Sequence, residues 1–517
     1  MADELEQLPV WVRRIDGSQV PFEADRICQS LYAAAESLGT ASAFLIRELS
    51  DVVLHFLAQA DYPAIPSTAQ IAEHVEKIVR EVGHPALARR YAELRQRPAE
   101  ESAKRRITLA WPGSADELAR DCQRVYALGA IFSRDIAAAV AERLLHLEGL
   151  EAPAKLASVI VEASRLMELP WWPALADWRQ CAGRQWIVDS PESLCTARMH
   201  PALTPHLCER LLSLPMLGQR EVELHLNVAE SSEEADSPLF LGGTDESARQ
   251  ERVNFVDGLL ERWKVLSATQ APALAWHLNE RSFDDDVERR HLHEMIRQRL
   301  QGRAVHFVFD RPHSPVALTN GLDRKGSGIL MEIGLDLPTL AARPDIQRDG
   351  AAFLKKLPSL ARMTVSAARQ KRQHLRGLPD ASPLMRPFLI ERAAVRVTPM
   401  GLDDAVERIT GASLGRSPLS LDFAVRVLQT LRSTLHDAGR PLSLDLRLDF
   451  ALQATPDQLP LAAKLHAESA IIAFGDEHPM NVDACTELLA SAWRSTPLVR
   501  MQLQRAGQML QQGELGL

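Results

Sequence analysis

The first hundred residues show a hairpin-like pattern followed by stretches with helical spacing. Two short runs with β-branched or aromatic residues, Val12–Ile15 and Gln19–Phe22, flank Asp16-Gly17-Ser18, which is a strong signal for a hairpin turn. Apolar residues then recur at helical spacing across 27–38, and Gly39 ends the pattern. We therefore predict a two-stranded hairpin that leads directly into a helix.

Three further helices are predicted before residue 97. Ser42 is placed to cap the first, and Ser67 or Thr68 to cap the second. Gly83-His84-Pro85 ends the second helix, and the third continues to about Leu94. The sequence thus predicts a small helical bundle under a hairpin lid.

Beyond a polar boundary near residue 97, helical spacing continues, and a strand pattern begins only near residue 220. Ser114 and Glu117 predict a capping box for a helix to about Leu128, and 136–147 and 154–167 also have helical spacing. After residue 220, predicted strands alternate with helices, which indicates an α/β fold with either a barrel or an open sheet. The predicted strands are Val222–Val228, Ala304–Phe309, Ile329–Leu335, Ala394–Val397, Leu442–Leu448 and Ala470–Phe474. The predicted helices are Val253–Ser267, Val287–Leu300, Ala351–Gln370, Leu402–Ile409, Phe423–Ala438 and Val482–Trp493.

Composition and charge narrow the class of protein. A chain of 517 residues with 46% hydrophobic and 25% charged residues is typical of a globular protein with two or three domains. The net charge of −9 argues against a nucleic-acid binder with a broad basic face, and no apolar run approaches the length of a membrane span. The 6 cysteines are scattered without a Cys-x-x-Cys pair, so we expect a protein of the reducing cytoplasm.

Basic residues around the predicted hairpin are the first candidates for a binding site. Arg13 and Arg14 lie on the hairpin, and Arg26 lies on the first turn of the following helix. Cations beside a helix N-terminus with free N–H groups form a plausible phosphate site. The alternative is that these arginines are solvated surface charges, and composition alone favours that simpler interpretation.

A family resemblance changes this balance. The segments Val12-Arg13-Arg14-Ile15-Asp16-Gly17, Ile65-Pro66-Ser67 and Ala88…Tyr91…Leu94-Arg95 resemble an ATP-cone, the regulatory nucleotide-binding module of many ribonucleotide reductases. The resemblance covers about residues 10–97 and implies binding of ATP or dATP. It implies phosphate contacts from Arg14 and Arg26 and a nucleotide contact from Thr68, with Arg13, Asp16 and Gly17 in the same site. Ile15 departs from the family, which usually has a second basic residue there.

The C-terminal part is similar to anaerobic, class III ribonucleotide reductases at two segments. These are Asn320-Gly321 with Gly326-Ser327-Gly328 through Leu337-Pro338-Thr339, and Thr398-Pro399-Met400-Gly401-Leu402-Asp403. The similarity implies a ten-stranded α/β barrel of the glycyl-radical type. We therefore predict an ATP-cone over 1–97, a helical connecting region over 98–200 and a reductase-like α/β barrel over 201–517.

The residues that radical chemistry requires in this family are missing from the matching positions. A glycyl-radical reductase needs a cysteine in the inner loop of the barrel and a C-terminal glycine loop. The segment that matches the cysteine loop, Arg311-Pro312-His313-Ser314-Pro315, has no cysteine, and the C-terminus lacks the glycine motif. The zinc-binding cysteines of the family are also absent. We predict no metal site, since His291 and His293 would face apart on a helix.

Two hypotheses from different classes follow. The first is a catalytically degenerate, reductase-like regulatory protein that binds ATP or dATP and forms a homo-oligomer. The second is a working enzyme, either a divergent anaerobic ribonucleoside-triphosphate reductase or another nucleotide-using enzyme. The catalytic residues are unknown on either hypothesis. Asp310 and His313, which follow a predicted strand, are candidate pocket residues because barrel sites form at that edge.

Overall fold

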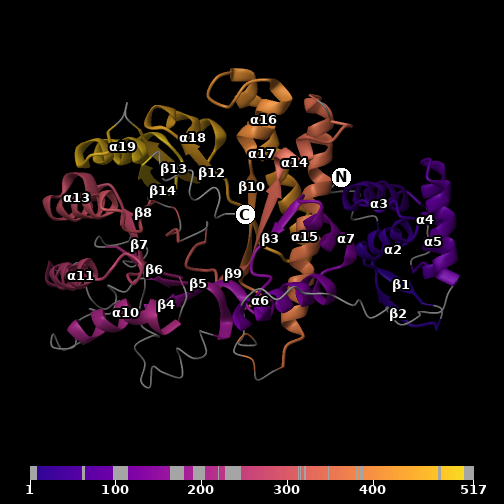
Figure 1. Ribbon diagram of the computed structural model, residues 1–517, viewed down its shortest axis with the longest axis horizontal. Helices are drawn as coiled ribbons and strands as arrows, with labels where there is room; N and C mark the ends of the chain where they lie inside the picture. Colours follow the sequence, from indigo (N-terminus) through magenta and orange to yellow (C-terminus); the bar gives the residue numbers. More distant parts are fainter. Residues whose placement is uncertain are drawn as a thin grey trace.

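The computed structural model describes most of the chain, and every structural statement below concerns this described part. It comprises residues 8–14, 16–60, 65–96, 114–163, 180–189, 204–218, 221–227, 246–312, 314, 316–318, 322–346, 348–379, 382, 384, 389–475 and 479–505. A small, mainly helical N-terminal domain lies at one side of the molecule, and an α/β barrel surrounded by helices forms the rest (Figure 1). Within the described residues, no helix is long and apolar enough to cross a membrane.

The N-terminal domain, described residues 8–96, matches the predicted hairpin and helical bundle. Strands β1 and β2 pair antiparallel with Val12 opposite Val20, and Gly17 in the turn has a φ of 83° that favours glycine. Ser42 caps the helix that begins at Ala43, as predicted. Ser67 forms a capping box with Gln70 at the helix that begins at Thr68. The elements are β1 (Trp11–Arg13), β2 (Gln19–Pro21), α2 (Asp25–Ser37), α3 (Ala43–Ala58), α4 (Thr68–Glu81) and α5 (Pro85–Gln96).

The rest of the described chain is built on one 12-stranded sheet, which confirms the predicted α/β class. Strands β4 to β8 run parallel to one another, as do β9 to β11 and β12 to β14. These strands are β4 (Leu156–Glu162), β5 (Ala182–Asp189), β6 (Glu221–Leu226), β7 (Ala273–Leu278), β8 (Val305–Phe309), β9 (Gly328–Asp336), β10 (Ala393–Met400), β11 (Leu446–Leu448), β12 (Ala451–Ala454), β13 (Ser469–Phe474) and β14 (Arg500–Arg505). A short strand, β3 (Leu145–Leu147), pairs with β9.

The sheet closes on itself as a barrel. One half consists of the parallel strands β4 to β8, and the other half consists of β9 to β14. The two halves meet in antiparallel pairs, β4 with β9 and β8 with β14. Strands β11 and β12 stand at opposite ends of the hydrogen-bonded order, yet only Asp449 and Phe450 separate them along the chain. They are therefore one interrupted strand that joins the two ends of the sheet, and Figure 1 shows the strands arranged around a central space.

The helical prediction for 154–167 is wrong, and that for 136–147 is only partly right. Residues 156–162 form strand β4, and β3 occupies 145–147, whereas helix α7 (Arg134–Ala141) covers only the start of the second stretch. A continuous apolar run such as Val159-Ile160-Val161 is typical of a parallel strand buried on both faces, and periodicity alone does not separate it from a buried helix. The sheet therefore begins before the predicted boundary at residue 200.

The six helices predicted after residue 220 are all present. They are α11 (Glu246–Val265), α13 (Asp286–Leu300), α15 (Gly350–Arg376), α16 (Leu402–Thr410), α17 (Pro418–Gly439) and α19 (Val482–Ser495). The other described helices are α6 (Ala115–Tyr126), α10 (Thr204–Gly218), α12 (Arg281–Asp284), α14 (Leu337–Ala341) and α18 (Pro460–Leu465), with a π-helical turn, η1 (Ala127–Ile131), and short 3-10 turns at Arg440–Leu442 and Pro456–Gln458. The predicted strand Leu442–Leu448 is shorter in the structure, because 440–442 is a 3-10 turn and only 446–448 is extended.

The loop between β8 and β9 reaches into the barrel. Leu318 and Leu322 pack with Ile187 of β5 and Ala394 of β10, and Ala317 packs with small residues of β7 and β8. This loop joins the two halves of the barrel, since β8 ends the first half and β9 begins the second. It therefore fills part of the interior with chain, and polar side chains from the strands occupy the remainder.

Ion pairs attach the N-terminal domain to the barrel through helix α15. Lys356 Nζ lies 2.8 Å from Glu48 Oε1, and Arg362 Nη2 lies 2.6 Å from Asp51 Oδ2. One helical face of α15 thus presents basic residues to acidic residues of α3. Figure 1 shows α15 between the N-terminal helices and the barrel strands.

A buried cluster around Arg47 completes this contact. Arg47 of α3 is 4% exposed, and its guanidinium lies 3.1 Å from Asp25 Oδ1 of α2 and 3.3 Å from Asp135 Oδ2 of α7. The thiol of Cys28 also donates to Asp135, and burial raises the pKa of that thiol to about 12. One arginine therefore pairs with carboxylates from both sides of the boundary between the two domains.

Candidate functional site

The hairpin of the N-terminal domain lies against the start of helix α4. The Arg13 N–H donates to the carbonyl of Pro66 at 2.9 Å, and Arg13 also forms a bridge with Ser67. Thr68 is the first residue of α4, so β1 and this helix N-terminus are adjacent. The free N–H groups of a helix N-terminus and neighbouring basic side chains can together bind a phosphate.

The other predicted binding residues occupy the hairpin turn and the start of α2. The Arg14 N–H donates to Ser18 O at 2.8 Å, and the Asp16 carboxylate accepts from the Ser18 N–H at 2.9 Å, which fixes the turn around Gly17. Hydrogen bonds from Ser18 lower the pKa of Asp16, so this carboxyl is ionised at neutral pH. Arg13 and Arg14 are exposed, as phosphate-binding side chains must be, and Ile15 lies outside the described residues.

Arg26 is held in place by Glu23. The guanidinium of Arg26 is 61% exposed, and its Nε lies 3.3 Å from Glu23 Oε2. The same carboxylate oxygen accepts from Arg369 Nη2 of α15 at 3.0 Å. Glu23 is therefore shared between a predicted phosphate-binding arginine and the helix that connects the N-terminal domain to the barrel.

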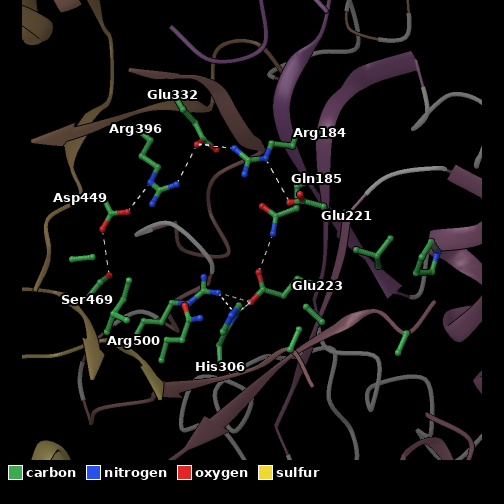
Figure 2. Close-up of a pocket in the computed structure, with 18 of the residues that line it drawn as sticks. Arg184, Gln185, Glu221, Glu223, His306, Glu332, Arg396, Asp449, Ser469 and Arg500 are labelled. Carbon is green, nitrogen blue, oxygen red and sulfur yellow. Dashed lines mark hydrogen bonds and ion pairs between the residues drawn. The ribbon is translucent and has the colours of Figure 1, made fainter. Parts of the chain in front are cut away.

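A second candidate site is a cavity of ≈ 810 Å³ inside the barrel (Figure 2). Nine of its strands contribute lining residues, and on β5 to β8 these lie in the first half of each strand. Charged and polar side chains make up 12 of the 21 lining residues, and Figure 2 shows several of them around one central space. The charged and histidine residues of the lining are Arg184, Glu221, Glu223, His306, Glu332, Arg396, Asp449 and Arg500.

One side of the cavity is a chain of ion pairs across β9, β10 and the β11–β12 junction. Arg396 Nε donates to Asp449 Oδ2 at 2.6 Å, and its Nη1 donates to Glu332 Oε2 at 3.2 Å. Arg184 Nη1 lies 3.7 Å from the same Glu332 oxygen, and Ser469 Oγ donates to Asp449 Oδ1 at 3.3 Å. Glu332 and Asp449 are nearly buried, so the arginines supply the counter-charges that such carboxylates require.

The opposite side of the cavity is organised by Glu223. This carboxylate is 1% exposed and accepts from Arg500 at 2.8 Å, His306 Nδ1 at 3.0 Å and Gln185 Nε2 at 3.0 Å. Burial opposes ionisation of Glu223, but Arg500 and His306 outweigh it and hold the pKa well below its ordinary value. Burial and the adjacent Arg500 lower the pKa of His306, so its imidazole is neutral at pH 7.

A third polar cluster lies at the carboxyl ends of β6, β7 and β8. Asp310 accepts from Asn227 Nδ2 at 3.0 Å and is bonded to His277 Nδ1 at 2.9 Å. His277 Nε2 lies 2.9 Å from His225 Nδ1, and burial lowers the pKa of His225 well below its ordinary value. An aspartate–histidine–histidine chain can orient a neutral imidazole for proton transfer.

The barrel sites agree only in part with the sequence-based candidates. Asp310, a candidate pocket residue, lies in the third polar cluster and not in the cavity lining, whereas His313 lies outside the described residues. The sequence analysis did not identify any of the charged residues that line the cavity. The available signal was a charge inside an apolar strand, as with Glu223, Glu332 and Arg396. Among the described residues, no group of three histidine, cysteine or acidic side chains could hold a metal ion.

Comparison with known proteins identifies the N-terminal domain. Residues 11–100 match the family model described as ATP cone domain. The match starts at β1 and takes in the hairpin and all four helices described above. No curated protein matches the chain.

Solved structures with the same overall fold are anaerobic ribonucleotide reductases. The enzyme from Thermotoga maritima with glycerol in the active site has a TM-score of 0.53 at 10% identity, over 94% of this chain and 91% of that chain. The same enzyme in complex with dATP and CTP has a TM-score of 0.51 at 10% identity, over 94% and 92%. A further anaerobic ribonucleotide reductase has a TM-score of 0.52 at 10% identity, over 95% and 90%. The chain therefore carries an ATP cone domain at its N-terminus, on a fold that it shares with anaerobic ribonucleotide reductases.

Proposed function

We propose that this chain is a regulatory protein whose ATP cone binds ATP or dATP and whose reductase-like barrel has lost radical chemistry. The ATP cone match supports nucleotide binding, and one structural neighbour was solved in complex with dATP and CTP. We further propose that the protein is a cytoplasmic homo-oligomer. In the described part of the chain, Cys28, Cys122, Cys181, Cys208 and Cys485 are free thiols, which is consistent with a reducing compartment.

We infer the loss of radical chemistry from the composition of the loop between β8 and β9. This loop, residues 310–327, contains no cysteine, although Ala317, Leu318 and Leu322 place it inside the barrel. Hydrogen abstraction from a ribose needs a radical carrier, and ordinary side chains do not supply one. A barrel without that thiol can still bind ligands and transmit a change in shape.

For the cone, we propose that Arg14 and Arg26 contact the phosphates and Thr68 the nucleotide, with Arg13, Asp16 and Gly17 shaping the site. The contact between β1 and the start of α4 supports this arrangement, because it brings the hairpin to a helix N-terminus. The exposure of Arg26 supports it too, since a partly free guanidinium can exchange Glu23 for a phosphate.

Replacing the proposed phosphate contacts should weaken nucleotide binding. Arg14→Ala and Arg26→Ala are each expected to cost about 1.5–3 kcal/mol of binding free energy, because a charge-assisted hydrogen bond to phosphate is lost. Isothermal titration calorimetry with ATP and with dATP measures this effect. Arg416→Ala, an exposed arginine on the barrel, is the matched control and should bind as the natural protein does. Unchanged affinity in both cone variants would reject this site.

Nucleotide binding is also expected to change the assembly state. The cone is joined to the barrel by the charged segment 97–106, which lies outside the described residues, and we propose that the cone responds to nucleotide as a unit. A ligand shifts an equilibrium between oligomers by its differential affinity for them. Sedimentation velocity without nucleotide, with ATP and with dATP should therefore give different distributions. Identical distributions at saturating nucleotide would contradict the switch.

A second candidate function is an enzyme that uses polar chemistry in the barrel. The observation that favours it is the Asp310–His277–His225 chain, because a neutral imidazole held by a carboxylate is suited to general base catalysis. A divergent anaerobic ribonucleoside-triphosphate reductase or another nucleotide-using enzyme belongs to this class. His277→Ala would abolish such an activity and leave ATP binding by the cone unchanged.

A further inference from the structure

The three arginines of the barrel cavity have hydrogen-bonding capacity that the described protein does not use. Each guanidinium is anchored on a carboxylate: Arg396 on Asp449 and Glu332, Arg500 on Glu223, and Arg184 on Glu148. Within the described residues, Nη2 of Arg184, Nη2 of Arg396 and Nη1 of Arg500 have no hydrogen-bond partner. Figure 2 shows the three groups bordering the same central space.

Two of the four carboxylates that line the same space use both of their oxygens. Glu223 uses both carboxylate oxygens to accept from Gln185, His306 and Arg500. Asp449 likewise uses both oxygens, one for an arginine and one for Ser469. The free N–H groups of the three arginines therefore match a ligand that supplies acceptor oxygens.

Charge and size narrow the class of ligand further. Three arginines share the lining with four carboxylates, Glu221, Glu223, Glu332 and Asp449. The carboxylates that anchor the guanidinium planes leave N–H groups for an oxyanion. The volume of ≈ 810 Å³ is much more than a phosphate ion occupies and lies in the usual range for organic ligands. Among the described residues, the lining has no phenylalanine, tyrosine or tryptophan that could stack on a nucleobase.

Neutral polar side chains also line the cavity. Gln502 from β14 and Ser469 from β13 belong to the lining, and His306 lies next to Arg500. Side chains of this kind pair with hydroxyl groups, because each hydroxyl both donates and accepts. An aliphatic molecule with hydroxyl groups and one oxyanion therefore matches the cavity better than either a bare ion or an aromatic ligand.

We propose that the barrel cavity binds a small hydroxylated organic anion of the class of sugar phosphates and sugar acids, with Arg184, Arg396 and Arg500 holding the oxyanion. This site is separate from the nucleotide site of the cone. It also lies away from the third polar cluster, since its lining comes from the first half of strands β5 to β8. The proposal stands whether or not the cone regulates assembly.

Calorimetric titration of the full-length protein tests the proposal. The probes are glucose 6-phosphate, gluconate and, as the uncharged control, glucose, all added with the cone saturated by ATP so that its phosphate site is filled. At least one of the two anions is expected to bind with a Kd of about 1 mM or lower. Glucose should bind much more weakly, because it leaves the free guanidinium N–H groups without an anionic partner.

Three variants locate the binding. Arg184→Gln should weaken binding of the anion at least about tenfold, because one charge-assisted hydrogen bond is lost. Since the Arg184 side chain is half-exposed, we expect this variant to fold normally. Ala304→Trp should also abolish binding by filling the cavity from its exposed edge without removing a charge. Arg416→Gln, on the outer surface, is the matched control and should bind normally.

The binding results either support the proposal or overturn it. Binding of glucose 6-phosphate alone or of gluconate alone, weakened by Arg184→Gln, supports the proposal and identifies the oxyanion. No binding of either anion, equal affinity for glucose, or unchanged affinity in both Arg184→Gln and Ala304→Trp would overturn it. None of these results depends on the Arg14 and Arg26 variants, so failure here and failure of nucleotide binding are distinguishable.

Discussion

Replacing Arg47 with methionine is expected to lower the free energy of unfolding of the cone by about 3–5 kcal/mol. Arg47 is almost fully buried, and it is the cation that faces both Asp25 and Asp135 at hydrogen-bonding distance. Methionine conserves much of the volume but leaves Asp135 without its counter-charge, and within the described residues Asp25 keeps only Arg369, whose Nη1 lies 3.9 Å from Asp25 Oδ2. The energetic cost is largest at Asp135, because this carboxylate is 1% exposed and water cannot solvate it. Chemical denaturation followed by circular dichroism measures the loss.

Two further variants show whether the effect is electrostatic. Arg89→Met removes an exposed arginine of α5 in the same domain and should change stability by no more than about 0.5 kcal/mol. Arg47→Met combined with Asp135→Leu should recover part of the loss, because an apolar replacement removes the buried, unpaired charge. A single variant Arg47→Met within about 1 kcal/mol of the natural protein would show that the cluster contributes little.

The second large effect is an absent activity. Under anaerobic conditions with a radical-generating partner enzyme, we expect no deoxynucleotide product above the level of a reaction without this protein. The physical reason is that the inner loop 310–327 has no thiol to abstract hydrogen from a ribose. Product chromatography tests for the deoxynucleotide, and electron paramagnetic resonance tests for a protein radical.

The control for that experiment is an anaerobic ribonucleotide reductase treated with its own activating enzyme in parallel. It must give product and a glycyl radical signal under identical conditions. Product formation by the present protein would mean that a group outside the inner loop carries the radical. Cys195 would then be the first residue to replace, since it lies outside the described residues and the other five cysteines do not line the cavity.

The sequence predicted the cone far better than the first strands of the barrel. The hairpin, its turn at Gly17 and the capping residues Ser42 and Ser67 are local signals, and the structure confirms each. Strand β4 was predicted as a helix because its apolar run has no alternation, and β5 was missed because Arg184 and Gln185 interrupt its apolar pattern. In both cases the strand is defined by its neighbours in the sheet rather than by its own residues.

The cavity could not be predicted for a related reason. Arg184 and Arg500 belong to strands that lie more than half of the chain apart, and only closure of the barrel brings them to one space. A local motif therefore does not exist for this site. A charge within a predicted strand, such as Glu332 between Met331 and Ile333, does indicate a polar interior, although it does not indicate which residues pair.

The shared carboxylate of Glu23 has a thermodynamic consequence. It accepts hydrogen bonds from Arg26, on the nucleotide side, and from Arg369 of α15, on the barrel side. A phosphate bound to Arg26 would compete with Glu23 for that guanidinium. It would thereby change the strength of the ion pair between Glu23 and Arg369. Because coupling free energies are reciprocal, any ligand or partner that displaces α15 would change the affinity of the cone for its nucleotide by the same factor. The Kd for ATP would then report on the state of the barrel without any contact between the two sites.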